Sequence, residues 1–224
     1  MSTDSLHHID PASWLGRSFA LLAQHFGPQH WWPASSPFEM AVGAVLTQNT
    51  AWRNVETAIE RLRRQGWLEA QALLKVDAES LAEAIRSAGY FRQKSGTLRR
   101  LAAAWDQAPQ GDDVAVVRRF WLALKGIGPE TADSIVLYAF GLPTFVVDAY
   151  TRRWLTRAGR LPGKGGYHEI QWFFEHNLPT SAPVFNEYHA LIVQLAKSHC
   201  TARKPDCPGC PLRGADLCPG CDHA

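Results

Sequence analysis

A glycine turn at residues 126–128, Gly-Ile-Gly, separates two apolar helical runs and constrains this chain more than any other feature. Two glycines allow positive φ and a close approach by another backbone. Pro129 suits the first position of the next helix, where no amide hydrogen bond is lost. The N–H groups and positive dipole end of that helix would point back at the turn. The turn predicts a helical hairpin with an anion site, although an ordinary hairpin with an accidental anion site fits equally well.

Helical periodicity runs through the whole chain. The run from Met40 to Leu46 is apolar nearly all round, which predicts a helix buried in the middle of a domain. Ser36 and Glu39 form a capping-box pattern just before it. No alternating strand pattern of useful length and no internal repeat occurs. The predicted fold class is therefore all-α.

The composition narrows the possible partners. At 224 residues the chain can hold one domain or two small ones with a real core. The net charge is only +2, but basic residues gather on several helices, which is compatible with nucleic acid and also with a solvated face. No apolar run precedes Asp10, and no segment approaches the length of a membrane span. We therefore expect a cytoplasmic, nucleoid-associated protein with no membrane partner.

All five cysteines lie between Cys200 and Cys221. A disulfide scaffold would spread them along the chain, so this crowding predicts a metal site. Four thiolates in so short a loop suit an iron–sulfur cluster or a zinc ion. A zinc site would leave Cys200 out, and its central gap is short for a zinc ribbon. Its ligands would be Cys207, Cys210, Cys218 and Cys221.

Two valines lead to Asp148, a carboxylate that could simply cap the helix beginning beside it. The glycine turn, a short helix and then Val-Val-Asp together resemble the helix-hairpin-helix DNA glycosylases, the endonuclease III superfamily. This resemblance implies that Asp148 serves catalysis. It also implies that a DNA phosphate is gripped by the turn residues Gly126, Ile127 and Gly128.

The resemblance spans residues 30–218, most of the chain. It implies two helical subdomains with a cleft between them and with Asp148 at their junction. One is a six-helix subdomain that contains the helix-hairpin-helix motif, residues 36–145. The other combines residues 1–35 with residues 146–224 and carries a C-terminal [4Fe-4S] cluster loop. The implied partner is double-stranded DNA containing damaged bases, and we expect a monomer.

The cysteine spacing extends the resemblance. The first three cysteines are spaced as in the family's [4Fe-4S] loop, which implies three ligands, Cys200, Cys207 and Cys210. The last gap is two residues longer than the family pattern, so Cys218 is the expected fourth ligand and Cys221 the alternative. Zinc is the alternative cofactor. The cluster would be structural and would fix the loop that carries Arg203 and Lys204, so that both could meet phosphate at a lower ordering cost.

Two further segments resemble DNA-facing parts of the family. Residues 46–50, Leu-Thr-Gln-Asn-Thr, resemble the loop after its central helix. Gln48 would there fill the hole left by a flipped base, although it could equally be a surface amide. Residues 89–94 resemble the family's next DNA-facing segment, in which Lys94 would contact DNA.

One departure from the family pattern concerns the reaction. Bifunctional members carry a lysine eighteen residues before the aspartate, and here that position is Glu130. A carboxylate cannot form a Schiff base with the sugar. We therefore expect a monofunctional DNA glycosylase of base excision repair, without AP lyase activity. Water would be the nucleophile, ionised Asp148 would stabilise the positively charged sugar, and an abasic site would be the product.

Trp-Trp-Pro at residues 31–33 and Leu-Thr-Gln-Asn-Thr at residues 46–50, with Glu130 in place of the lysine, resemble the 3-methyladenine glycosylase branch. The base pocket would be formed by Trp31, Trp32 and Pro33, with Trp52 beside the Gln48 loop. Indole faces attract a cationic ring, and a purine alkylated at a ring nitrogen leaves as a neutral base. The resemblance therefore implies alkylated purines of the 3-methyladenine type, with Glu130 and Lys197 completing the pocket. Core packing is the alternative role for each tryptophan, and Lys197 could instead extend to solvent.

Two other functions stay open. The chain could excise uracil, mismatched thymine or oxidised bases in the manner of endonuclease III, although the missing lysine disfavours oxidised bases. It could also bind lesions in DNA without turnover. An Asp148→Asn variant separates an enzyme from a binder, because only an enzyme would lose base release while DNA binding persists.

Overall fold

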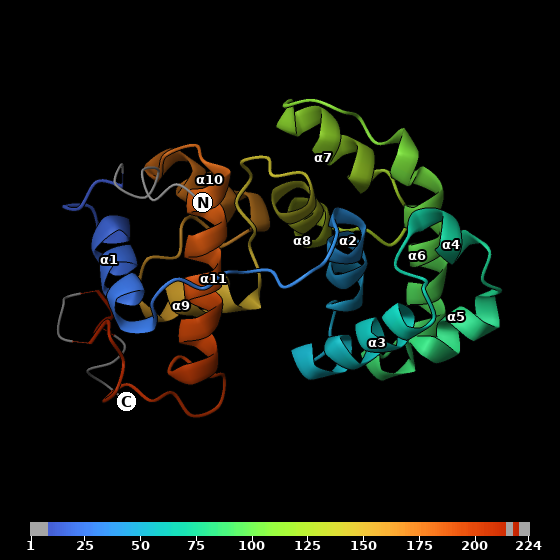
Figure 1. Ribbon diagram of the computed structural model, residues 1–224. Helices are drawn as coiled ribbons and strands as arrows, with labels where there is room; N and C mark the ends of the chain where they lie inside the picture. Colours follow the sequence, from blue (N-terminus) through green and yellow to red (C-terminus); the bar gives the residue numbers. More distant parts are fainter. Residues whose placement is uncertain (1–8, 214–216, 220–224) are drawn as a thin grey trace. The chain divides into compact units, whose positions relative to one another are not determined.

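A computed structural model describes residues 9–213 and 217–219, in which every regular element is a helix (Figure 1). The all-α prediction is confirmed. No helix in these residues is both long and apolar enough to cross a membrane. The elements are α1 (Trp14–Phe26), α2 (Pro37–Leu46), α3 (Trp52–Arg64), α4 (Ala70–Leu74), α5 (Ala78–Ala84), η2 (Arg86–Ala88), α6 (Phe91–Ala104), η3 (Trp105–Gln107), α7 (Val114–Leu122), α8 (Pro129–Ser134), η4 (Ile135–Ala139), α9 (Ala149–Arg157), α10 (Tyr167–Asn177) and α11 (Ala182–Ser198).

The chain divides into two compact units. The terminal unit consists of Met1–Trp31 with Pro143–Ala224, and the central unit is Trp32–Leu142. The division therefore falls after residues 31 and 142, whereas the sequence predicted it after residues 35 and 145. One consequence is that the neighbouring residues Trp31 and Trp32 belong to different units.

α2 lies at the centre of the central unit. Its residues Phe38–Leu46 are all buried, and it packs against α3, α6, α8 and η4. Ser36 begins the helix, because its hydroxyl accepts a hydrogen bond from the Glu39 N–H at 3.1 Å. A helix with an apolar surface on every side can satisfy that surface only inside a core, so the prediction of a buried helix is confirmed.

The terminal unit joins the first helix to the last third of the chain. α11 is largely buried and packs against both α1 and α9. The Tyr188 hydroxyl on α11 donates a hydrogen bond to the Leu15 carbonyl of α1 at 2.8 Å. The indoles of Trp14 and Trp154 stack with their ring centroids 4.9 Å apart. These aromatic contacts hold α9, which begins at Asp148, against the core of the unit.

Candidate functional site

The predicted hairpin is present between α7 and α8. Gly126 has a φ of 96°, and a Cβ placed on it would lie 2.3 Å from Thr97 Oγ1. Gly128 is extended and open, while Ile127 is buried at 6% exposure and anchors the turn. The following helix is irregular, because α8 continues into the π-helical turn η4 rather than forming one straight α-helix. The buried Ile127 side chain therefore anchors the turn, while the backbone of Gly126 and Gly128 lies at the surface.

Gln48 lies beside this hairpin in the central unit. Its amide nitrogen donates hydrogen bonds to the Gly126 carbonyl at 3.1 Å and to Thr131 Oγ1 at 2.8 Å. The Gln48 amide is therefore hydrogen-bonded to the hairpin and is not a surface amide that contacts solvent alone. The adjacent Asn49 has a positive φ of 52°, so the loop makes its sharp polar turn at that residue.

Lys94 corrects the prediction of a DNA contact. The residue is buried at 4% exposure. Its ammonium donates to three backbone carbonyls, those of Leu46 at 2.9 Å, Gln48 at 2.7 Å and Ala88 at 2.7 Å. An ammonium group has three N–H donors, and here protein carbonyls accept all three. Lys94 therefore holds the Gln48 loop through its backbone carbonyls and has no N–H donor left for a phosphate.

Asp148 sits at the N-terminus of α9 in the terminal unit. Its Oδ1 accepts a hydrogen bond from the Thr151 N–H at 2.7 Å, so it caps the helix as one interpretation predicted. Its Oδ2 lies 3.5 Å from Nε2 of His189, and the Asp148 side chain is 12% exposed. Burial alone would raise the pKa of this carboxyl, but His189 and the Thr151 N–H together outweigh burial and lower it. Asp148 is thus both a cap and a carboxylate that stays ionised at neutral pH.

Two of the predicted pocket tryptophans meet in the central unit. The ring centroids of Trp32 and Trp52 lie 5.1 Å apart in an edge-to-face arrangement. Gly43 leaves room for Trp32, because a Cβ there would lie 3.1 Å from the indole. Both indoles line a cavity of about 290 Å³ together with Pro33, Ala34, Glu39, Val55, Glu56, Ile59, Glu60 and Arg63. Trp52 is held in place by its indole N–H, which donates to Glu56 at 2.8 Å.

The other predicted pocket residues lie elsewhere. Trp31 belongs to the terminal unit, where the ammonium of Lys197 lies 5.2 Å from its ring centroid. That distance is within the range of a cation–π interaction. Glu130 is exposed on the first turn of α8 and does not line the cavity of Trp32 and Trp52. The structure therefore brings together Trp32, Pro33 and Trp52 and, separately, Trp31 and Lys197.

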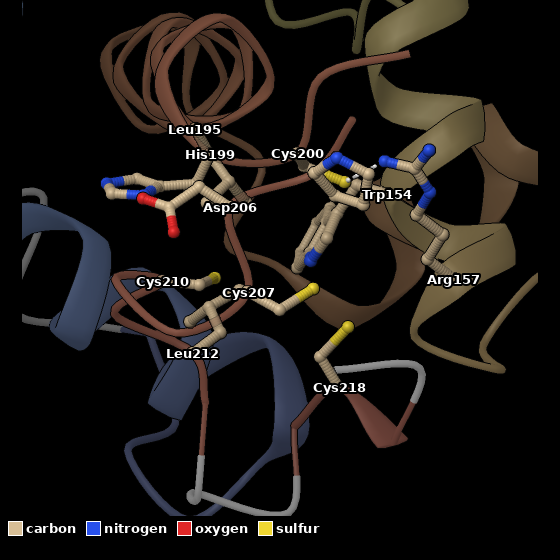
Figure 2. Close-up of a pocket in the computed structure, with 11 residues that line it drawn as sticks. Trp154, Arg157, Leu195, His199, Cys200, Asp206, Cys207, Cys210, Leu212 and Cys218 are labelled. Carbon is tan, nitrogen blue, oxygen red and sulfur yellow. Dashed lines mark hydrogen bonds and ion pairs between the residues drawn. The ribbon is translucent and has the colours of Figure 1, made fainter. Parts of the chain in front are cut away.

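Four cysteines surround one cavity in the terminal unit (Figure 2). Its volume is about 90 Å³, and its walls include Cys200, Cys207, Cys210 and Cys218. α9 contributes Trp154 and Arg157 to the walls, and Arg157 Nη1 donates to the Cys200 sulfur at 3.2 Å. In the described part of the chain, no group of three His, Cys, Asp or Glu side chains is arranged to hold a metal ion. Cys221, the alternative ligand, lies outside the described residues.

The donors around this cavity fit a sulfur cluster. Four cysteines of one loop line it, and four thiolates are the ligand set of a [4Fe-4S] cluster. The indole N–H of Trp154 is buried and has no hydrogen-bond partner among the described residues, so it is a donor that a cluster sulfur could satisfy. The Arg153 guanidinium holds the loop by donating to the Cys200 carbonyl at 2.7 Å. Two predicted DNA-binding residues, Arg203 and Lys204, are exposed on the same loop.

The sequence analysis missed His189 and the two arginines of α9 that hold the cysteine loop. His189 is 5% exposed on an otherwise apolar face of α11. A histidine on such a face was a signal in itself, because a buried imidazole needs a polar partner. Arg153 and Arg157 are among the basic residues that the sequence analysis treated only as a group, and spacing alone could not pair them with a loop more than forty residues away.

Comparison with known sequences defines the family. The chain matches the HhH-GPD superfamily of base excision DNA repair proteins over residues 42–179. A Methanocaldococcus jannaschii protein whose name proposes a DNA repair glycosylase is 41% identical over 203 residues, which are 87% of this chain and 92% of that protein. Endonuclease III of Sulfolobus acidocaldarius is 28% identical over 184 residues, 81% of each chain.

Solved structures resemble the fold over most of its length. A trapped endonuclease III–DNA covalent intermediate has a TM-score of 0.79 at 25% identity, covering 94% of this chain and 98% of that chain. The 3-methyladenine DNA glycosylase of H. pylori bound to 1,N6-ethenoadenine has a TM-score of 0.69 at 28% identity, covering 83% and 97%. By its sequence and its fold, the chain belongs to the HhH-GPD superfamily of base excision DNA repair proteins, as an endonuclease III-like DNA glycosylase.

Proposed function

We propose that this DNA glycosylase is monofunctional and releases alkylated purines, of the 3-methyladenine type, from duplex DNA. The observation that carries the choice of substrate is the cavity walled by the edge-to-face indoles of Trp32 and Trp52. A relative of the same superfamily, from H. pylori, is a 3-methyladenine DNA glycosylase and was solved with 1,N6-ethenoadenine. The two supports are independent, since one is a feature of this chain and the other belongs to a relative.

The cavity has the chemistry that a cationic base requires. Indole faces carry negative charge density and attract cations. Three carboxylates, Glu39, Glu56 and Glu60, also line the cavity, against the single cation of Arg63. The guanidinium of Arg63 pairs with both Glu39 and Glu60, at 2.6 Å and 2.8 Å, so the charge of Glu56 is the least compensated. A purine alkylated at a ring nitrogen would meet attraction here that a neutral, undamaged purine would not.

Asp148 supplies the charge for the chemical step. A base must leave the stack before its N-glycosidic bond can be reached. As that bond breaks, positive charge develops on the deoxyribose, and a buried ionised carboxylate stabilises it. The lowered pKa of Asp148 keeps it ionised at neutral pH, where it can also orient the attacking water. An alkylated purine needs no proton to leave, because departure neutralises its own positive charge.

The proposed product is an abasic site in an intact strand. Strand cleavage by this superfamily's bifunctional mechanism needs an amine that attacks the sugar. Glu130 occupies that position of the sequence and offers only a carboxylate, exposed on the first turn of α8. Water is then the nucleophile, and the strand stays intact until alkali breaks it.

We further infer a [4Fe-4S] cluster held by Cys200, Cys207, Cys210 and Cys218. A cavity of about 90 Å³ among four thiols suits a cluster of several atoms better than one zinc ion, which sulfurs contact at about 2.3 Å. The cluster would supply a structural anchor for the loop. The chain's own part is to present Arg203 and Lys204, both exposed, to DNA phosphates. Metal analysis of native protein tests this, because zinc without iron would refute the cluster.

A base-release assay tests the proposed function. Duplex DNA methylated in bulk is incubated with the protein, the freed bases are identified, and the strand is examined before and after alkali. We expect methylated purines in solution, an intact strand before alkali, and a loss of about 10³-fold or more in the Asp148→Asn variant with duplex binding retained. Release only from duplexes that contain uracil, mismatched thymine or oxidised bases would overturn the alkylpurine assignment. Binding of these duplexes without release of any base would overturn the assignment of enzymatic activity.

A further inference from the structure

We propose that His189 is a positioning residue that holds the Asp148 carboxylate in the orientation in which it stabilises the sugar. This inference rests on the catalytic role of Asp148 given under the proposed function. His189 stands in the middle of α11, forty-one residues after Asp148, and no sequence motif connects the two. Asp148 and His189 come into contact only when the terminal unit folds.

The two carboxylate oxygens of Asp148 lie beside two different groups. Oδ1 accepts from the Thr151 N–H at 2.7 Å, which is the helix cap. Oδ2 lies 3.5 Å from Nε2 of His189, whose side chain is only 6% exposed. A cap fixes one oxygen but leaves the carboxylate able to rotate about its χ2 angle. A second group on the other oxygen removes that freedom, and preorganised charge is what makes a carboxylate effective in catalysis.

The surroundings make the partner necessary. Phe145 lies edge-on to the His189 imidazole, with ring centroids 6.3 Å apart, and the Asp148 side chain itself is only 12% exposed. Burial of that kind raises the pKa of a carboxyl and favours its neutral form. The pKa of Asp148 is nevertheless lowered, and His189 is the largest of the opposing causes. Without His189, the protonated and catalytically inert form of Asp148 becomes more stable.

The other ionisable groups of the unit do not replace this contact. On α10, the Glu175 carboxylate accepts from the Phe145 N–H at 2.9 Å, and the Tyr167 hydroxyl lies 3.5 Å from the Val147 nitrogen. A negative charge at Glu175 would raise the pKa of Asp148, not lower it. On α9, Arg153 and Arg157 bond to the cysteine loop instead. On α1, Arg17 is exposed.

The test is the pH dependence of base release in single turnover, from about pH 2.5 to about pH 8, so that the acid limb set by Asp148 falls inside the range. His189→Phe keeps an aromatic ring and removes the donor, and His189→Gln keeps a polar donor of similar reach. His176→Phe is the control, since that histidine is exposed on α10 and its ring stacks on Trp172 of the same helix. We expect the acid limb of the profile to move to higher pH in His189→Phe, to return toward wild type in His189→Gln, and not to move in His176→Phe.

A purely structural role predicts something different. If His189 only fills the core, His189→Phe lowers the melting temperature or the maximal rate but leaves the acid limb where it was, and that result overturns the proposal. If His189→Phe does not fold, the carboxyl titration of Asp148, followed by ¹³C NMR in the wild type, decides. A titration midpoint at or above the ordinary value of 3.8 would refute the role of His189. This readout needs no turnover, so a wild type that releases no base refutes the proposed function separately.

Discussion

Gly126 combines a positive φ of 96° with a Cβ position only 2.3 Å from Thr97 Oγ1. Any side chain there is strained twice, by its backbone and by the clash. We expect Gly126→Ala to lower the free energy of unfolding by about 1–3 kcal/mol, measured by urea denaturation. Gly128→Ala is the matched control in the same turn, because Gly128 has a φ of −94° and no atom near its Cβ position. Equal losses in the two variants would contradict this account of the turn.

Asp133 of α8 is fully buried and forms an ion pair with Arg118 of α7. The Arg118 guanidinium of α7 contacts both of its oxygens, at 2.6 Å and 3.1 Å. Removing one member of a buried pair leaves an uncompensated charge. We expect Arg118→Met to lower the free energy of unfolding by about 3 kcal/mol in urea denaturation. Arg86→Met is the control, because Arg86 and Glu83 are both 60% exposed, and its loss should stay within about 0.5 kcal/mol. A loss of less than about 0.5 kcal/mol in Arg118→Met would contradict this account of the pair.

At the scale of elements, the Gln48 loop is held on two sides. The Lys94 ammonium of α6 binds the carbonyls that end α2 and begin the loop, and the Gln48 amide binds the hairpin. Lys94→Met keeps the length of the side chain but leaves three carbonyls without their donor. We expect a loss of about 2 kcal/mol in the free energy of unfolding, since the relief of a buried charge offsets part of the lost hydrogen bonding. A variant as stable as wild type would show that water replaces the ammonium.

The pH dependence of this loss has a defined sign. Burial lowers the pKa of Lys94 from 10.5 to about 8, so between these values the unfolded chain binds more protons than the folded one. The folded state therefore gains stability as the pH rises through this window. The difference in free energy of unfolding between wild type and Lys94→Met should widen from about pH 8 to about pH 10.5, measured by urea denaturation at each pH. A narrowing difference would mean that the three carbonyls hold the proton more tightly than water does.

Sequence patterns predicted the helices more accurately than they predicted the contacts between distant parts of the chain. The run of Met40–Leu46 predicted a buried helix because apolar residues on every side permit no other location. Asp148 was correctly placed as a cap because capping is a local interaction. Lys94 was misjudged because a lysine in a polar segment usually lies at the surface, and its carbonyl partners come from other elements. His189 was missed for the same reason, since its partner precedes it by more than forty residues.

At the scale of the whole molecule, the two units have separate means of stabilisation. The central unit rests on the continuous core around α2. The terminal unit also depends on the cysteine loop, which the Trp14 indole of α1 holds by donating to the Leu217 carbonyl at 3.2 Å. Arg153 and Arg157 of α9 bind the other end of that loop. Loss of the proposed cluster should therefore weaken α1 and α9 directly and leave the central unit with its own core.

Cluster removal should consequently separate the stabilities of the two units. We expect Cys207→Ala, or chelation of iron from native protein, to speed amide hydrogen exchange in α1, α9 and α11. In either case the four cysteines are no longer joined through one bound cluster. Exchange in α2, α6 and α8 should stay close to wild type, since their packing partners lie within the central unit. His176→Ala is the control for substitution in the terminal unit, because His176 is exposed on α10 and does not line the cysteine cavity. Equal acceleration in both units would mean that they unfold as one cooperative body, and no acceleration in α1 and α9 would mean that the loop contributes nothing to their stability.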